Sequence, residues 1–286
     1  DAHADDTGYS HEIYSIEDAK NASSKLSYPV MVKPCDGSGS RGASRVDTPT
    51  DFVDACIYAM EGSITHRAVV EPFIEGCEYG VESFVDNGAI HILAVMQKEM
   101  TEPPYYAELG HRIPSGLSNE LESKVKNCVR NAIIALGINH GSVNMDLILG
   151  NQGNVHIVDI GARMGGNLIG SHIVRYGTGI DYIANMIKAA VGDHTEWKPQ
   201  WQPCAVATQL LALKPGKIKE LPDFDAIKIK YEVEIEHHLN IGDTITPYRT
   251  NLDGCGYVIA HGYDVDDAIC TANRVKEIID QSIIRY

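Results

Sequence analysis

Two neighbouring apolar segments, each carrying one acid, constrain the fold of this chain more than any other feature. Residues 156–160 contain three β-branched side chains and predict a short buried strand, which runs into the glycine-rich loop 161–166. The upstream segment 143–149 is also apolar, and residues 150–153 have the composition of a turn. We therefore expect two paired strands that are joined by a turn and followed by a flexible loop.

Pairing of these strands would bring Asp146 and Asp159 close together, with Arg163 at the start of the loop. Two close carboxylates repel each other unless a cation lies between them. Mg²⁺ suits such a place, because it binds few carboxylates and completes its shell with water and substrate phosphates. A strand-end Asp is often only a turn residue or a helix cap, so these residues alone leave a structural role open.

The length of the chain limits the number of domains, and its net charge limits the kinds of ligand that it can bind. The 286 residues suffice for one large domain with subdomains or for two domains. The net charge of -15 argues against a general nucleic-acid binder, although a local pocket of Lys and Arg could hold a phosphate ligand. No apolar run reaches membrane-spanning length, so we expect no membrane partner.

The spacing of the cysteines indicates the cellular compartment of the protein. Seven cysteines are scattered without a CxxC pair, which predicts free thiols in a reducing cytoplasm and hence a cytoplasmic location. The first residues look like a loop and include no initiator Met, so we expect a fragment or a processed form of a longer polypeptide.

The N-terminal part predicts a glycine-rich hairpin. Residues 28–33 favour a buried strand that ends in Lys33, and residues 43–46 favour a returning strand. Between them, residues 35–42 hold three Gly and two Ser around one Arg, and the backbone N–H groups of such a loop can cradle phosphates. The pattern is neither a P-loop nor a dinucleotide-binding motif. A mobile surface hairpin is an equal alternative at this point.

The rest of the chain predicts further strands and helices. Residues 69–76 are punctuated by Pro72 and Gly76 and favour a strand that passes between subdomains. Other strands are expected at 78–85, 90–97, 205–213, 227–233 and 257–260, and helices at 15–26, 49–60, 119–136, 181–190 and 265–284. His111 is isolated beside Arg112, a position that by itself favours a structural or solvated role.

The order of these features resembles the ATP-grasp superfamily of carboxylate–amine ligases. The resemblance covers roughly residues 28–192 and rests on the Lys-Pro strand, the hairpin, the Glu-Pro-Phe-Ile segment and the two acid-bearing strands. Three segments look most like the ligases that join amino acids into dipeptides: 108–115, 141–146 and 159–163. The region from residue 205 onward is similar to the C-terminal unit of those enzymes.

This resemblance implies an α+β, ATP-grasp fold, in which two α+β subdomains clasp ATP and a small C-terminal α+β unit follows. The expected division is 1–68 for the small subdomain with the hairpin, 69–198 for the large subdomain with the metal and phosphate site, and 199–286 for the C-terminal unit.

The resemblance also implies how the nucleotide is held. Lys33 would contact the ATP phosphates, and Glu78 would bond the ribose hydroxyls. The hairpin residues expected to close over the phosphates are Gly37, Ser38, Gly39, Ser40 and Gly42. The residues expected to line the adenine slot are Glu71, Phe73 and Ile74.

For metal binding and catalysis, the resemblance implies that Asp146 and Asp159 hold Mg²⁺, with Mn²⁺ as a substitute. Arg163 would bind the transferred phosphoryl group, His111 would lie near it or near the substrate carboxylate, and Lys33 completes the catalytic set. Both metal positions are usually Glu in these ligases. Gly161 stands where an Asn often adds a ligand, so the number of metal ions stays open.

The function that this resemblance implies is a ligase that joins a carboxylate to an amine through an acyl phosphate and releases ADP and phosphate. Its partners would be small-molecule substrates, amino acids or dipeptides, with a homodimer as one arrangement common among relatives. The alternatives are an enzyme that uses bicarbonate, like carbamoyl-phosphate synthases or carboxylases, and a catalytically silent nucleotide-binding module.

Overall fold

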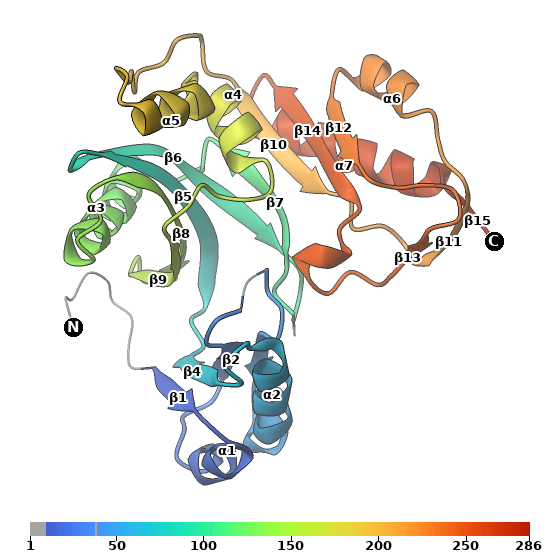
Figure 1. Ribbon diagram of the computed structural model, residues 1–286. Coiled ribbons are helices and arrows are strands. Elements are labelled where there is room, and N and C mark those ends of the chain that lie inside the picture. Colours follow the sequence, from blue (N-terminus) through green and yellow to red (C-terminus); the bar gives the residue numbers. More distant parts are fainter. Residues whose placement is uncertain (1–9, 38, 104) are drawn as a thin grey trace.

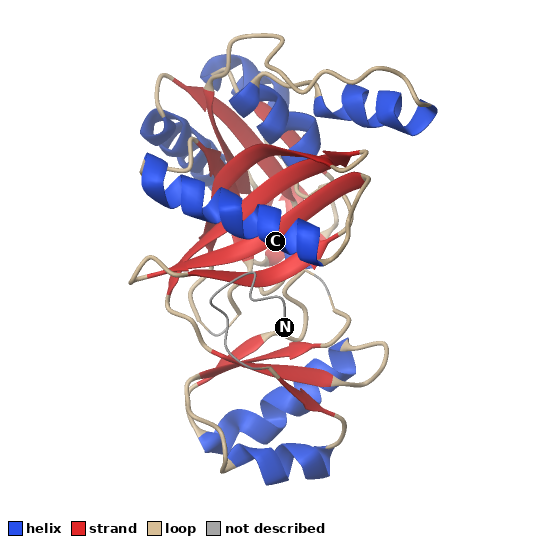
Figure 2. Cartoon of the chain, turned by 90° about the vertical axis from the view of Figure 1, so that its left-hand side faces the viewer, coloured by secondary structure: helices blue, strands red, loops and turns tan. Residues whose placement is uncertain are grey.

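The computed structural model of the protein describes residues 10–37, 39–103 and 105–286 (Figure 1). It consists of a small N-terminal sheet with two helices, a large sheet with helices on both faces, and a C-terminal extension of that sheet. Figure 2 shows the same units from the side, with the small sheet below the large one. The α+β class that the sequence predicts is confirmed.

The N-terminal unit is a four-stranded sheet in the order β1–β4–β2–β3. Its elements are β1 (His11–Ile13), α1 (Ile16–Ser23), β2 (Val30–Pro34), β3 (Ser44–Val46), α2 (Pro49–Gly62) and β4 (Ala68–Pro72). The Ser15 hydroxyl caps α1 by accepting a hydrogen bond from Asp18 N. β2 and β3 pair as an antiparallel hairpin around the glycine-rich loop, as predicted. Both helices bury apolar side chains against the sheet, around Phe52 and Cys56.

The large sheet has eight antiparallel strands in the order β12–β14–β10–β7–β6–β5–β8–β9. Its strands are β5 (Gly76–Asp86), β6 (Ala89–Met100), β7 (Glu108–Ile113), β8 (Gly141–Gly150), β9 (Val155–Gly161), β10 (Ala205–Leu210), β12 (Glu234–His237) and β14 (Gly256–Gly262). The pairing of β8 with β9 confirms the predicted partnership of the two acid-bearing strands.

Helices pack on both faces of this sheet, so its central strands are buried on both sides. On one face α3 (Asn119–Ala135) covers side chains such as Val81 and Val85. On the other face Phe84 and Met96 are covered by the π-helical turn η1 (Ile169–Ile173), α4 (Val174–Thr178) and α5 (Tyr182–Val191). Consistent with this double cover, residues 79–85 of β5 are buried without a break.

The C-terminal part adds a third core, in which α7 (Val265–Ser282) packs against β10 and β14. Beside it lie β11 (Gly216–Glu220), β13 (Thr244–Ile245) and β15 (Ile284–Arg285), which form a small sheet, together with the short helix η2 (Asn251–Asp253). The expected strand at 227–233 is wrong. These residues fall largely within the helix α6 (Phe224–Tyr231), because the Asp223 carboxylate accepts a hydrogen bond from Ala226 N and starts a helix there.

Strands on either side of residue 198 pair in one sheet, since β10 lies between β7 and β14. Three of the four hydrophobic cores nevertheless follow the expected division closely, and the fourth takes Val206 and Ile259 from the C-terminal unit. We therefore keep 1–68, 69–198 and 199–286 as a proposed division by hydrophobic core, although β4 crosses the first boundary and its residues 69–72 complete the N-terminal sheet. None of the seven cysteines, all of which lie in the described residues, forms a disulfide, as the sequence predicts. None of the helices in the described residues has the length and apolar character needed to cross a membrane.

Candidate active site

A cavity of about 510 Å³ lies where the N-terminal unit meets the large sheet. One side of its wall comes from β2, β3, β4 and the connection to β5, and the other side from β6, β8, β9 and the loop after β6. The lining residues are Met31, Lys33, Arg45, Glu71, Pro72, Phe73, Ile74, Glu75, Gly76, Cys77, Glu78, Gln97, Lys98, Met100, Thr101, Glu102, Pro103, Tyr106, Ile148, Ile157 and Val158. A ligand in this cavity would therefore contact both units at once.

Five of the residues expected to bind the nucleotide line this cavity together: Lys33, Glu71, Phe73, Ile74 and Glu78. Lys33 and Glu71 project from the adjacent strands β2 and β4 and form an ion pair of 2.5 Å. Glu78 lies near the start of β5, and burial raises the pKa of its carboxyl group.

The cavity also has an apolar and aromatic wall, in which Phe73 and Ile74 were expected from the resemblance but Arg45, Tyr106 and the residues of β8 and β9 were not. Phe73 stacks against Arg45, whose guanidinium carbon lies 4.2 Å from the ring centroid, and against Tyr106 at 5.5 Å between ring centroids. Ile148 and Ile157 extend this wall from β8 and β9. Such a wall can hold a flat aromatic ring by stacking and apolar contact.

None of the described residues of the glycine-rich loop lines the cavity. Gly39, Ser40 and Gly42 have left-handed backbone φ angles of 66°, 60° and 73°. Ser40 Oγ donates a hydrogen bond to Tyr106 O (3.3 Å), and Gly39 O accepts one from Asn251 N (3.4 Å). Gly37 packs on Pro34. Ser38 lies outside the described residues. The loop thus connects to a cavity residue and to the C-terminal unit.

The two acids of the central motif lie opposite each other on β8 and β9. Asp146 pairs with Asp159, whereas the following pair is Leu147 with Ile157, so Val158 is an extra residue that forms a β-bulge. Without the bulge, Asp146 would face Val158 and Asp159 would point to the other side of the sheet. Because of the bulge, the side chain of Asp159 lies on the same face of the sheet as the side chain of Asp146. The Asp159 carboxylate accepts a hydrogen bond from Ile160 N (2.9 Å).

Asp146 is linked to His111 by a buried charge cluster whose centre is Lys98. The Lys98 ammonium lies 3.0 Å from Asp146 Oδ2, 3.3 Å from Glu108 Oε2 and 3.7 Å from Glu78 Oε2. Burial opposes the charge on Lys98, but the three carboxylates outweigh it and hold the pKa of the ammonium above its ordinary value. The sequence signal that could have indicated this cluster is a charged residue directly after the apolar strand expected at 90–97.

His111 is buried against Glu108 on β7. Its Nδ1 lies 3.4 Å from Glu108 Oε1, yet neither ring nitrogen makes a hydrogen bond within the described residues. Burial lowers the pKa of the imidazole and favours its neutral form. Unsatisfied buried polar atoms are costly, so these two nitrogens are open to a water molecule or a ligand group.

Arg163 lies outside the cavity wall, on an exposed loop, and donates a hydrogen bond to the adjacent Met164 O (3.0 Å). The segment that follows Arg163 is anchored by Glu82, a fully buried residue that the sequence analysis missed. Glu82 accepts hydrogen bonds from Gly165 N (3.1 Å), Asn144 Nδ2 (3.1 Å) and Tyr182 OH (2.7 Å). Its position within an apolar strand is the same kind of signal that marks Asp146.

Family comparison assigns the chain. Residues 26–171 match the model of the ATP-grasp domain, which is more than half of the chain. The chain belongs to the ATP-grasp family. Residues 209–280 match a second family model, the L-amino acid ligase C-terminal domain 2. The ATP-grasp fold and the likeness to L-amino acid ligases that the sequence predicts are thus confirmed.

The individual proteins similar to this chain include one uncharacterized protein and two ligases. The uncharacterized protein y4rH of Sinorhizobium fredii is 25% identical over 264 residues, covering 91% of this chain and 54% of y4rH. A D-alanine–D-alanine ligase of Halorhodospira halophila is 33% identical over 117 residues, which is 40% of this chain and 38% of that ligase. The crystal structure of an L-amino acid ligase from Bacillus licheniformis has a TM-score of 0.81 at 23% identity, covering 95% of this chain and 66% of that protein. The chain spans about half the length of y4rH.

ATP-grasp ligases use ATP and Mg²⁺, and the residues of this site fit both. The cavity combines an aromatic wall with the cations Lys33, Arg45 and Lys98, and His111 has unused nitrogens nearby. The opposed carboxylates of Asp146 and Asp159 suit a divalent cation. Among the described residues, no three or more His, Cys, Asp or Glu side chains are placed to hold a metal alone. Mg²⁺ bound at such a site completes its shell with substrate phosphates and water.

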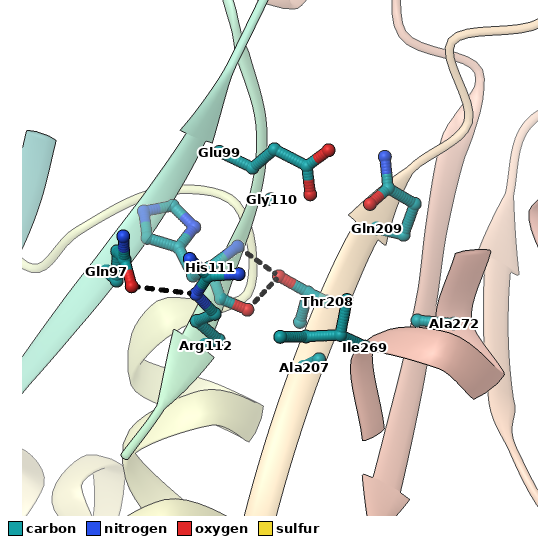
Figure 3. Close-up of a pocket in the computed structure, with 10 residues that line it drawn as sticks. All are labelled: Gln97, Glu99, Gly110, His111, Arg112, Ala207, Thr208, Gln209, Ile269 and Ala272. Carbon is teal, nitrogen blue, oxygen red and sulfur yellow. Dashed lines mark hydrogen bonds between the residues drawn. The ribbon is translucent and has the colours of Figure 1, made fainter. Parts of the chain in front are cut away.

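A second and much smaller pocket lies on the other face of this ATP-grasp sheet. Figure 3 shows a pocket between β7, β10 and α7, where Arg112 donates a hydrogen bond to Gln97 Oε1 (3.0 Å). Its volume is about 10 Å³, which leaves room for about one water molecule. Side chains alternate along β7, so Gly110 and Arg112 face this pocket and the His111 ring faces Lys98 instead.

Proposed function

We propose that this ATP-grasp protein is a ligase that joins a carboxylate to an amine, with amino acids or dipeptides as substrates, and releases ADP and phosphate. The proposal rests on one observation: a cavity large enough for a nucleotide occurs together with a C-terminal unit of the L-amino acid ligase type. That unit reaches the site itself: Tyr248 OH donates a hydrogen bond to Glu108 O, and Glu108 contacts Lys98.

The chemistry requires activation of the carboxylate, because it has no adequate leaving group for attack by an amine at neutral pH. In the first step a carboxylate oxygen attacks the γ-phosphorus of ATP, the bond to ADP breaks, and an acyl phosphate forms. In the second step the amine attacks the carbonyl carbon, phosphate leaves, and the nitrogen loses a proton. Positioning and charge neutralisation carry most of such catalysis.

The nucleotide-binding roles that we propose follow the cavity. Phe73 and Ile74 support the adenine together with Glu71, Glu78 bonds the ribose, and Lys33 contacts the phosphates. The hairpin residues Gly37, Ser38, Gly39, Ser40 and Gly42 close over those phosphates. Closure excludes water, which would otherwise hydrolyse the acyl phosphate.

Besides Lys33, the catalytic and metal-binding roles that we propose belong to four residues. Asp146 and Asp159 hold Mg²⁺, which neutralises part of the negative charge on the phosphates. Arg163 binds the transferred phosphoryl group once its loop turns toward the cavity. His111, neutral and without a hydrogen bond in the described residues, donates to a phosphoryl or carboxylate oxygen.

The test is phosphate release from Mg-ATP by the full-length polypeptide, across a panel of amino acids, dipeptides and bicarbonate, with products identified by mass. We expect phosphate only with particular acid–amine pairs, together with a condensed product of the corresponding mass. Release with bicarbonate alone would instead support the carboxylase-like alternative. Binding of ATP without phosphate release from any substrate would support a silent nucleotide-binding module.

A further inference from the structure

A cluster of a thiol, an imidazole and a carboxylate lies on the large sheet, outside the cavity wall. Cys204 directly precedes β10, Glu234 belongs to β12 and His261 belongs to β14, the strand between the other two (Figure 1). None of these three residues lines the cavity of about 510 Å³. The cluster therefore needs an explanation of its own.

The register of the three strands brings these side chains together. Val206 pairs with His261, and Ile259 pairs with Glu234. Because side chains alternate along a strand, Cys204 shares the face of Val206, and His261 shares the face of Ile259. Cys204 and Glu234 are thus the two diagonal neighbours of His261, one on each side, and diagonal neighbours lie within reach of long side chains.

The distances place a nucleophile, a base and an acid in sequence. Cys204 Sγ lies 3.4 Å from His261 Nδ1, and His261 Nε2 lies 3.7 Å from Glu234 Oε1. With the imidazole proton on Nε2, facing Glu234, Nδ1 accepts a hydrogen bond from the thiol. This is the order of groups by which proteins activate a nucleophile. Burial raises the pKa of the Cys204 thiol, so the resting sulfur keeps its proton and needs a base to react.

The helical segments over this face of the sheet hold the base and the acid. The His172 Nε2 atom on η1 lies 3.6 Å from Glu234 Oε2. The Tyr176 ring on α4 meets the His261 ring edge-on at 4.5 Å between centroids, and Tyr176 O accepts a hydrogen bond from Cys204 N (3.1 Å). The Glu234 carboxylate thus faces two imidazoles and can stabilise His261 when it takes up a proton.

The other exposed cysteines have no such base. The four exposed cysteines are Cys35, Cys77, Cys204 and Cys270. The partner of Cys35 is Glu12 Oε1 at 3.8 Å, whose negative charge opposes a thiolate. Neither Cys77 nor Cys270 is hydrogen-bonded to a histidine in the described part of the chain. An exposed thiol beside a held imidazole is the setting in which cysteines become reactive.

We propose that Cys204 is a site of reversible covalent modification, which reacts with the disulfides of small thiols. The sulfur attacks one sulfur of the disulfide while its proton passes to His261 Nδ1. The disulfide bond breaks, a mixed disulfide forms on Cys204, and the other half leaves as a thiolate that takes the proton from His261. The disulfide is the oxidant, so no further reagent is needed. The rival explanation is a structural hydrogen bond that only fixes the start of β10.

Reaction rates of individual cysteines separate the two explanations. The full-length polypeptide would be incubated with oxidised glutathione at pH 7, and the fraction of each cysteine that carries glutathione would be followed by peptide mass spectrometry. A thiol with an ordinary pKa of about 8.5 is only about 3% ionised at pH 7, so a base can raise its rate by about 10-fold or more. We expect Cys204 to react about 10-fold faster than Cys270, the exposed reference on α7. A rate equal to or lower than that of Cys270 would refute the proposal.

Two variants test the base and its partner. His261→Asn removes the base and should lower the rate of Cys204 to that of Cys270, which itself stays unchanged. Glu234→Gln removes the negative charge and should lower the rate of Cys204 by a smaller factor. His66→Asn, in the N-terminal unit, is the matched control and should change neither rate, because asparagine readily adopts the φ of 53° found there. An unchanged rate of Cys204 in His261→Asn would contradict the role of the imidazole.

The buried cysteines report whether each variant is folded. Cys56, Cys128 and Cys255 should stay unmodified in a folded protein and become reactive in an unfolded one. If His261→Asn exposes them, Glu234→Gln decides, and an unchanged rate of Cys204 in that variant refutes the proposal. The reaction requires no nucleotide, so its failure would leave the proposed ligase function untouched.

Discussion

Among single residues, Glu82 is a buried acid whose hydrogen bonds position the loop that carries the exposed Arg163. It accepts three hydrogen bonds from different parts of the chain, and one donor, Gly165 N, lies two residues after Arg163. A methyl group on Gly165 would meet Glu82 Oε2 at 2.8 Å, so the loop backbone is packed directly against this carboxylate. Burial raises the pKa of Glu82 to about 7, although its hydrogen bonds favour the ionised form.

Replacement of Glu82 by Gln should therefore change how stability depends on pH. The folded protein holds the Glu82 proton up to about pH 7, whereas the unfolded chain releases it near 4.5. The raised pKa stabilises the folded state fully below 4.5, and this contribution is lost as the pH rises through 7.

We expect the unfolding free energy of the unmodified protein, relative to Glu82→Gln, to fall by about 3 kcal/mol between pH 4.5 and 7.5. Urea unfolding at several pH values measures this difference, and the comparison cancels other titrating groups. A difference that stays constant over the range would contradict the environment described for Glu82.

Arg163→Ala should lower turnover by roughly 10²-fold or more, the scale of losing one transition-state contact. The rate of phosphate release with the substrate pair found in the panel measures the effect. Arg274→Ala is the control, because Arg274 packs on Tyr231 at the C-terminal helix, away from the cavity wall. Near-normal turnover of Arg163→Ala would remove Arg163 from the proposed catalytic set.

At this scale the sequence allowed some residues to be predicted and not others. Asp146 and Asp159 could be found because each acid stands out in an apolar strand. Lys98 and Glu82 give the same signal, but their partners come from distant strands, so pairing had to be known before either could be interpreted. The place of Tyr106 beside Phe73 depends on the path of the loop after β6, which no local pattern determines.

At the scale of elements, close approach of backbones fixes how the strands pair. Gly110 on β7 lies so near β10 that an added Cβ would meet Thr208 O at 2.1 Å. Gly76 at the start of β5 is in the same situation, with Leu149 O at 2.3 Å. Because these two positions lack a side chain, the neighbouring strands can approach closely, and cavity residues on adjacent strands lie side by side.

Gly110→Ala should consequently destabilise the protein, because β7 and β10 would have to separate. Overpacking of this kind lowers the free energy of unfolding by about 3 kcal/mol. Gly166→Ala is a matched control, since a Cβ there would meet nothing within 4 Å. Thermal unfolding measures both variants, and equal melting temperatures for the two would show that the strands adjust without strain.

Most elements could be predicted from period and composition, including the hairpin, α3 and the paired strands β8 and β9. The segment 227–233 could not, because its β-branched residues favour a strand while the cap at Asp223 and tertiary packing select a helix. The bulge at Val158 also escaped prediction. It is visible only as a shift of one residue in the pairing of β8 with β9.

At the scale of the whole molecule, three parts of the chain meet at the cavity. The N-terminal unit supplies Lys33 and Glu71, and the large sheet supplies Glu78 and Lys98. The C-terminal unit contributes from outside the wall, since Asn251 contacts both the glycine-rich loop and Glu108. This arrangement lets one ligand couple all three parts, as the closing of an active site over a reactive intermediate requires.

The central claim is that a carboxylate is activated by phosphoryl transfer, and isotope transfer tests it most directly. The full-length protein would be given Mg-ATP and amino acids whose carboxyl groups carry ¹⁸O, and the released phosphate would be weighed by mass spectrometry. Attack of the carboxylate on the γ-phosphorus predicts phosphate with one ¹⁸O atom, alongside ADP and a condensed product. Condensation with unlabelled phosphate, or with AMP and pyrophosphate, would contradict the account.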